Sequence, residues 1–132
     1  IYNVFGPGQM PDSGAVFPKF AWASNNYMCT PIIYGDGNQT RDFTYVKDLV
    51  VWLYELMFKS NKKGTVHLGY GDPISINNLC KTIFSRMPEV VHLPANKFEI
   101  KHSKCPVKNK GLVGRDQGIK ETMNWYRNLW KS

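Results

Sequence analysis

The residues best suited to chemistry lie in one stretch, Gly35-Asp36-Gly37-Asn38-Gln39-Thr40-Arg41-Asp42-Phe43-Thr44-Tyr45-Val46-Lys47-Asp48. It places two glycines, a cation and an aromatic side chain in a turn that leads directly into an amphipathic helix. Glycines let the backbone approach a ligand closely, and a guanidinium can bind phosphate oxygens in pairs. The stretch therefore predicts an anion-binding turn with Arg41 as its cation. The alternative interpretations are an ion pair of Arg41 with Asp42 or Asp48, or a hydrogen bond that braces the loop.

Other kinds of chemistry have weaker support in the sequence. The three histidines have no acid or nucleophile at a useful spacing, so no catalytic triad and no catalytic residue is predicted. The three cysteines are far apart and odd in number, which favours reduced thiols over a disulfide framework. No two cysteines lie close together in the sequence, so we predict no metal site.

Composition bounds the class of protein. The chain has 132 residues, 42% of them hydrophobic and 14% aromatic, which indicates one globular domain. Its net charge of +7 favours an anionic partner, although solvated surface lysines explain such a charge equally simply. No motif for nucleic-acid binding is present. No apolar run approaches the roughly 20 residues of a membrane span, and with reduced cysteines we expect a cytoplasmic protein.

The elements that must position the turn follow from hydrophobic periodicity. Apolar residues at helical spacing predict helices over 15–25, 46–59, 76–86 and 119–130. Short apolar runs predict strands over 1–5, 31–34, 65–68, 90–93 and 98–100, and the basic segment 101–117 is interpreted as loop. The predicted fold class is mixed α/β, with short strands and about four helices.

Several motifs in order along the chain carry a family resemblance. They are Asn3-Val4-Phe5-Gly6-Pro7-Gly8-Gln9, the stretch 35–48, His67-Leu68-Gly69, Ser75-Ile76-Asn77-Asn78-Leu79 and Trp125-Tyr126. Together they resemble the C-terminal half of the extended short-chain dehydrogenase/reductases, the NAD-dependent nucleotide-sugar epimerases and dehydratases that include UDP-glucose 4-epimerase. The resemblance implies that residues 1–132 are a small substrate-binding domain without a complete Rossmann sheet. Because the first residue is Ile1, we interpret the chain as a fragment that lacks the N-terminal, NAD-binding Rossmann half.

The catalytic parts of that family have no counterpart here. The glycine turns lack G-x-G-x-x-G spacing, and no tyrosine has a lysine four positions later. We therefore predict an isolated chain that is inactive and holds no cofactor, with NAD(P) as the cofactor of the intact enzyme. The expected partners are a nucleotide-diphosphate sugar, the missing Rossmann half and a second copy of the chain, which would cover an apolar face left exposed.

The resemblance also implies a substrate site. Arg41 would contact the substrate diphosphate, and Asn3 would lie near it, although an asparagine there also suits an ordinary turn. Ile32 and Tyr34 lie on the strand that would run along the nucleotide base, with a plain buried strand as the alternative for Ile32. Val16 stands at the helix start that would close over base and ribose, and core packing is its alternative interpretation.

The sequence also departs from the family pattern. A second phosphate-binding arginine expected after Pro88 has no clear counterpart, and Lys97 could replace it only as a point charge. The leading hypothesis is the substrate-binding part of a nucleotide-sugar epimerase/dehydratase. A stand-alone, non-catalytic nucleotide-sugar or anion-binding module is the alternative, and a basic nucleic-acid-binding protein carries less weight.

Overall fold

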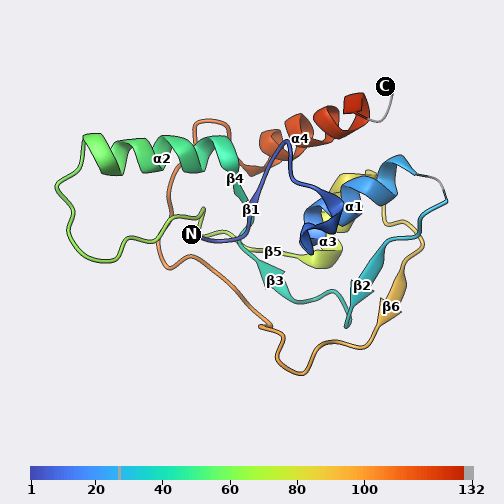
Figure 1. Cartoon of the computed structure of the whole chain (residues 1–132). Coiled ribbons are helices and arrows are strands. Elements are labelled where there is room, and N and C mark those ends of the chain that lie inside the picture. Colours follow the sequence, from blue (N-terminus) through green and yellow to red (C-terminus); the bar gives the residue numbers. More distant parts are fainter. Residues whose placement is uncertain (27, 130–132) are drawn as a thin grey trace.

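The computed structural model describes residues 1–26 and 28–129 (Figure 1). The described helices are α1 (Val16–Asn25), α2 (Val46–Phe58), α3 (Ile76–Phe84), α4 (Arg115–Leu129) and a 3-10 turn, η1 (Pro11–Ser13). The described strands are β1 (Val4–Phe5), β2 (Ile32–Tyr34), β3 (Thr40–Arg41), β4 (Thr44–Tyr45), β5 (Ile74–Ser75) and β6 (Val91–Leu93). This confirms the mixed α/β class with four α-helices and short strands.

The strands of the described chain pair two by two and form no larger sheet. β1 pairs in parallel with β4, β2 in parallel with β6, and β3 antiparallel with β5. Figure 1 shows α2 and α4 along one side of the molecule and the β2–β6 pair on the opposite side, beside α1 and α3. Strands of two or three residues contribute few ladder hydrogen bonds, so other contacts must hold these pieces together.

Most predicted elements are present, and two predicted strands are wrong. The four helices and the strands over 31–34 and 90–93 agree with the structure within a few residues at each end. Residues 65–68 form no strand, although buried Leu68 accepts one hydrogen bond from Tyr2 N at 3.2 Å. Residues 98–100 belong to an exposed loop. The predicted end of the last helix at residue 130 lies outside the described residues.

The hydrophobic core lies between α1, α3, α4 and the β1–β4 pair. Buried apolar side chains from these elements pack against one another, among them Phe5, Phe17, Tyr45, Leu79 and Tyr126. A smaller cluster of Leu49, Trp52 and Leu68 lies beneath α2. Each helix contributes residues three and four positions apart, as an amphipathic helix must when it covers a core with one face.

Two fully buried carboxylates join the loops to this framework. Asp42 accepts hydrogen bonds from the backbone N–H groups of Tyr70 at 3.2 Å, Gly71 at 2.7 Å and Cys105 at 3.1 Å. Asp48 binds a different set of groups at the start of α2. It accepts from the Tyr70 hydroxyl at 2.6 Å and from the N–H groups of Val113 at 2.9 Å and Gly114 at 2.8 Å. These carboxylates therefore take the place of a sheet in connecting distant segments.

The ionisation of the Asp48–Tyr70 pair follows from the same contacts. Burial opposes the charge of Asp48, but the hydrogen bonds from Tyr70, Val113 and Gly114 outweigh it and lower the pKa of the carboxyl. Burial and the neighbouring carboxylate raise the pKa of the Tyr70 hydroxyl. The carboxylate therefore stays ionised and the phenol stays protonated, which is the pairing that the hydrogen bond requires.

Replacing Asp42 by Ala should destabilise the chain strongly. The change leaves three backbone N–H groups without their acceptor, and we expect the free energy of unfolding to fall by about 3–5 kcal/mol. Urea unfolding followed by tryptophan fluorescence measures this, with Glu89→Ala, an exposed carboxylate, as the control. Asp42→Asn keeps one acceptor oxygen and should lie between them. Equal stabilities of Asp42→Ala and Glu89→Ala would show that the buried carboxylate is not a structural anchor.

Candidate functional site

The turn over residues 35–39 shapes one end of the site. Gly35 and Gly37 have φ angles of 73° and 76°, a left-handed conformation that favours glycine. Asp36 Oδ1 accepts from the N–H of Asn38 at 2.9 Å, and this bond is the main cause of a lowered Asp36 pKa. Asn77, on α3, donates its side-chain amide to the carbonyl of Asp36 at 3.0 Å. The turn is thus held from within and from a helix far away in sequence.

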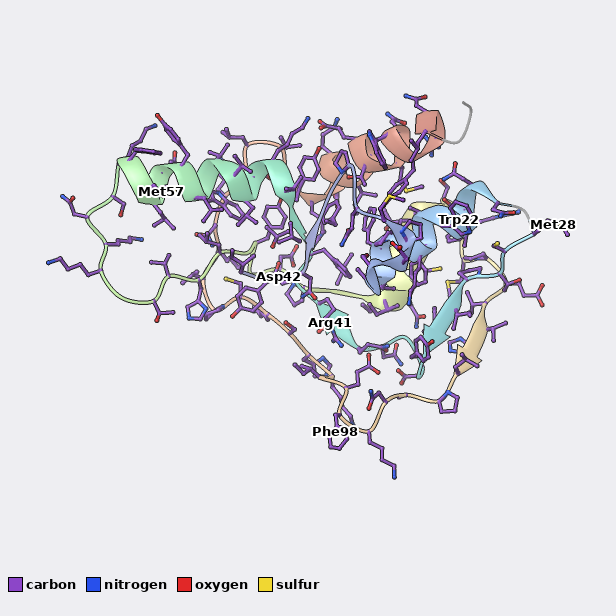
Figure 2. All side chains as sticks on the ribbon, viewed as in Figure 1. Trp22, Met28, Arg41, Asp42, Met57 and Phe98 are labelled. Carbon is purple, nitrogen blue, oxygen red and sulfur yellow. The ribbon has the colours of Figure 1, made fainter. Side chains whose placement is uncertain are left out.

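β3 then sends successive side chains to opposite sides. The Asp42 side chain, just after β3, points toward its three N–H donors in the protein interior. Because side chains alternate along an extended chain, the Arg41 side chain points to the opposite side. Figure 2 shows Asp42 on the α2 side of β3 and Arg41 on the side facing the loop with Phe98. The buried aspartate therefore determines where the guanidinium points.

Arg41 points into a cavity of about 270 Å³. The described residues that line it come from the segment before β1, the start of α1, β2, the turn, β3 and the loop after β6: Asn3, Val4, Gln9, Ala15, Val16, Phe17, Ile32, Ile33, Tyr34, Gln39, Arg41, Phe43, Ile76 and Glu99. All five residues predicted from the sequence, Asn3, Val16, Ile32, Tyr34 and Arg41, are among them. The structure thus brings together positions that are spread over 39 residues of the chain.

Arg41 makes one ion pair and one hydrogen bond to a backbone carbonyl. Its Nη2 lies 3.3 Å from Glu99 Oε1, and its Nη1 donates to the carbonyl of Thr40 at 2.9 Å. The brace to a carbonyl is therefore present. The proposed ion pair of Arg41 with Asp42 or Asp48 is wrong, because other groups donate to both of those carboxylates and the guanidinium pairs with Glu99.

β2 forms a second wall of the cavity. It pairs only with β6 in the described chain, so its other edge carries no strand. Ile32 and Tyr34 are 47% and 49% exposed, whereas Ile33 between them is buried. The interpretation of Ile32 as a plain buried strand residue is therefore wrong, since its side chain reaches the surface beside the cavity.

The two remaining predicted residues, Val16 and Asn3, also line the cavity. Val16 is partly buried, packs against the main core and lines the cavity, so core packing and site lining hold together for this residue. Asn3 is exposed at the cavity edge, and its carbonyl accepts from Thr44 N at 3.1 Å.

Three polar residues that line the cavity, Gln9, Gln39 and Glu99, are not among the site residues predicted from the sequence. Gln39 donates to the Tyr34 carbonyl at 2.7 Å and lies 3.3 Å from Glu99 Oε1. Its position two residues before Arg41 would have placed it on the same side of an extended chain. No local spacing places Glu99 beside Arg41, because the two residues are 58 positions apart in the sequence. Lys97 lines a neighbouring cavity beyond Gln39 and not the cavity of Arg41.

Two glycine turns of the described chain, at Gly6 and at residues 69–71, have causes other than the binding of a dinucleotide phosphate. In the turn Gly69-Tyr70-Gly71, the N–H groups of Tyr70 and Gly71 already donate to Asp42, a carboxylate that would repel a phosphate. At Gly6, a side chain would collide with Val46, so close packing onto α2 explains the glycine. Among residues 1–26 and 28–129, no group of three or more His, Cys, Asp or Glu side chains could hold a metal ion.

Comparison with known proteins identifies relatives. The sequence profile described as the NAD dependent epimerase/dehydratase family matches residues 1–69. UDP-N-acetyl-alpha-D-glucosaminuronate decarboxylase of Bacillus cytotoxicus is 32% identical over 97% of this chain and 45% of its own length. Human dTDP-D-glucose 4,6-dehydratase is 31% identical over 98% of this chain and 42% of its own length. The chain belongs to the NAD dependent epimerase/dehydratase family.

A solved structure agrees with this assignment. UDP-N-acetylglucosamine 4-epimerase from Methanobrevibacter ruminantium M1, in complex with UDP-N-acetylmuramic acid, superposes with a TM-score of 0.83 at 31% identity. The match covers 97% of this chain and 44% of that one. This family member thus spans a little under half the length of the relatives that it matches. In its described residues, no helix has the length and apolar character needed to cross a membrane.

Gly37→Ala tests whether the turn depends on its glycine. The left-handed backbone disfavours any side chain, and an added methyl group would also collide with the Asn77 amide. We expect the free energy of unfolding to fall by about 2–4 kcal/mol, the sum of backbone strain and overpacking. Gly64→Ala is the matched control, since Gly64 has a φ angle of 88° with open space around it and should lose only about 1 kcal/mol. A Gly37→Ala chain as stable as Gly64→Ala would refute the close approach to Asn77.

Proposed function

We propose that this chain binds a nucleotide-diphosphate sugar and forms the substrate-binding part of an NAD-dependent epimerase/dehydratase. The observation that carries the proposal is the convergence of Asn3, Val16, Ile32, Tyr34 and Arg41 on one cavity. Three similar proteins named above have nucleotide sugars in their names. They carry out decarboxylation, dehydration and epimerisation by name, so the proposal concerns the shared substrate class and not one reaction.

The cavity is suited to both ends of such a ligand. The guanidinium of Arg41 would bind diphosphate oxygens through charge-assisted hydrogen bonds, with the Asn3 amide as a further donor. The half-exposed side chains of Ile32 and Tyr34 would flank the base, and the unpaired edge of β2 offers backbone groups to its polar edge. Val16 would cover base and ribose from α1.

The redox part of the reaction would belong to residues outside this chain. NAD supplies hydride transfer in the family, and in this chain the N–H groups of Tyr70 and Gly71 already donate to Asp42. We therefore propose that the 132 residues orient the sugar and do not transfer hydride by themselves. A stand-alone nucleotide-sugar-binding module would share this cavity, and the two functions differ only in whether a longer protein completes the enzyme.

Arg41→Ala tests the proposed diphosphate contact. A charge-assisted hydrogen bond contributes about 1.5–3 kcal/mol, so the dissociation constant for UDP-glucose should rise about 10- to 100-fold. Isothermal titration calorimetry measures it, with Arg86→Ala as a control that removes an exposed arginine away from the cavity. Arg41→Lys should be intermediate, because an ammonium lacks the planar fork.

Two results, one from these titrations and one from an activity assay, would contradict the proposal. Unchanged UDP-glucose binding by Arg41→Ala would contradict the proposed site. Turnover of UDP-glucose by the isolated chain with NAD would contradict the assignment of hydride transfer to residues outside it.

The exposed face of α2 is the proposed contact for the rest of the enzyme. Four apolar side chains at helical spacing are more than half exposed there: Val50, Tyr54, Met57 and Phe58. Such a stripe is a typical protein contact surface. Relatives that are more than twice as long have further chain with which to cover it.

We expect the isolated chain to self-associate through this stripe at high concentration. Sedimentation velocity should show dimers or larger species, and Met57→Glu/Phe58→Glu should shift the chain toward monomer, because charges oppose burial of the face. Lys63→Glu makes the same change in net charge at an exposed site beyond the helix and should leave the association unchanged. A chain that stays monomeric at the highest concentrations would count against the contact.

A further inference from the structure

Glu99 enters the cavity from a loop that is attached at both ends. On one side, Gly35 N donates to the Leu93 carbonyl at 2.8 Å, which continues the β2–β6 pairing. On the other side, Thr40 N donates to the Lys101 carbonyl at 2.9 Å, and Ser103 N donates to the Thr40 carbonyl at 3.0 Å. Residues 94–100 span the gap as a strap beside the cavity mouth.

The strap itself is weakly packed between these attachments. Phe98 and Ile100, on either side of Glu99, are 91% and 65% exposed. Figure 2 shows Phe98 at the outer tip of the strap, away from the helices. Displacing the strap would therefore break few buried contacts, and segments of this kind open at low free-energy cost.

The charges of the cavity cancel through Glu99. Arg41 is the one cation and Glu99 the one anion among the described residues that line it, and they lie 3.3 Å apart. Their side chains are 17% and 23% exposed, so water screens this pair less than a pair on the open surface. Gln39, whose Nε2 lies 3.3 Å from the same Oε1, holds the carboxylate in this position.

A carboxylate and a phosphate make the same kind of contact with a guanidinium. Both offer oxygens to its planar fork, so Glu99 takes a place that an anionic ligand would need. A diphosphate that entered with Glu99 in position would also meet its negative charge at close range.

We propose that Glu99 is an internal competitor for the anion site, and that a nucleoside diphosphate binds only by displacing it from Arg41 together with the strap. The inference rests on the proposed function and adds a specificity-determining residue to that site. It predicts that this cavity selects against anions relative to neutral nucleosides until Glu99 leaves. Removing the charge of Glu99 should therefore improve the binding of a diphosphate and not that of a neutral nucleoside.

The test compares Glu99→Gln, Arg41→Ala and the double variant with the 132-residue chain, using UDP and uridine as probes in calorimetry. Glu99→Gln keeps the shape and the contact to Gln39 while removing the charge. We expect the dissociation constant for UDP to fall about fivefold or more, and that for uridine to stay unchanged. Glu89→Gln makes the same change in net charge on an exposed residue and should alter neither constant.

The outcomes separate the competitor role of Glu99 from the proposed binding of a diphosphate at Arg41. If Arg41→Ala weakens UDP binding and the gain from Glu99→Gln becomes smaller in the double variant, both the anion site and the competitor role are supported. If Arg41→Ala weakens UDP binding but Glu99→Gln leaves it unchanged or weaker, the competitor role is wrong while the anion site stands. If UDP binding by Glu99→Gln is absent, or is unaffected by the further loss of Arg41, the proposed function fails and the inference fails with it.

Discussion

The structure depends on two buried carboxylates more than on any sheet. The paired strands of the described chain are two or three residues long, too short to hold the loops by ladder hydrogen bonds. Asp42 and Asp48 instead accept six hydrogen bonds from segments between 22 and 66 residues away. A buried charge is tolerated only when it is satisfied in this way, so each aspartate requires the loops to adopt one arrangement.

The position of the guanidinium is a consequence of that constraint. Asp42 fixes which side of β3 faces inward, and Arg41 must then project from the other side into the cavity. The glycine turn before it is held by Asn77, so the segment is supported at both ends. The guanidinium, although it stands on so short a strand, is thereby positioned by the same buried network that stabilises the fold.

The polar contacts within the cavity show a balance of charge rather than an open anion pocket. Gln39, Arg41 and Glu99 form one connected group, so a change in any one of them alters the contacts of the other two. Affinity for an anion would then depend on the difference between two interactions of the same guanidinium, one with Glu99 and one with the ligand. Members of one family can differ in affinity through such a residue without any change of fold.

The sequence by itself determined the helices, the family resemblance and five of the residues that line the cavity, because each of these follows from local spacing or from a contiguous motif. The spacing of apolar residues predicted the helix Val46–Phe58, and the glycines before Arg41 predicted that it is the cation of an anion-binding turn. Only the tertiary structure decided the partners of the charged groups. Glu99 meets Arg41 across 58 residues, and Asp42 meets Cys105 across 63, through loops whose path no local pattern encodes. The same reason explains the wrong strand over 65–68. An apolar run becomes a strand only where another segment pairs with it, and here Tyr2 supplies a single backbone-to-backbone hydrogen bond.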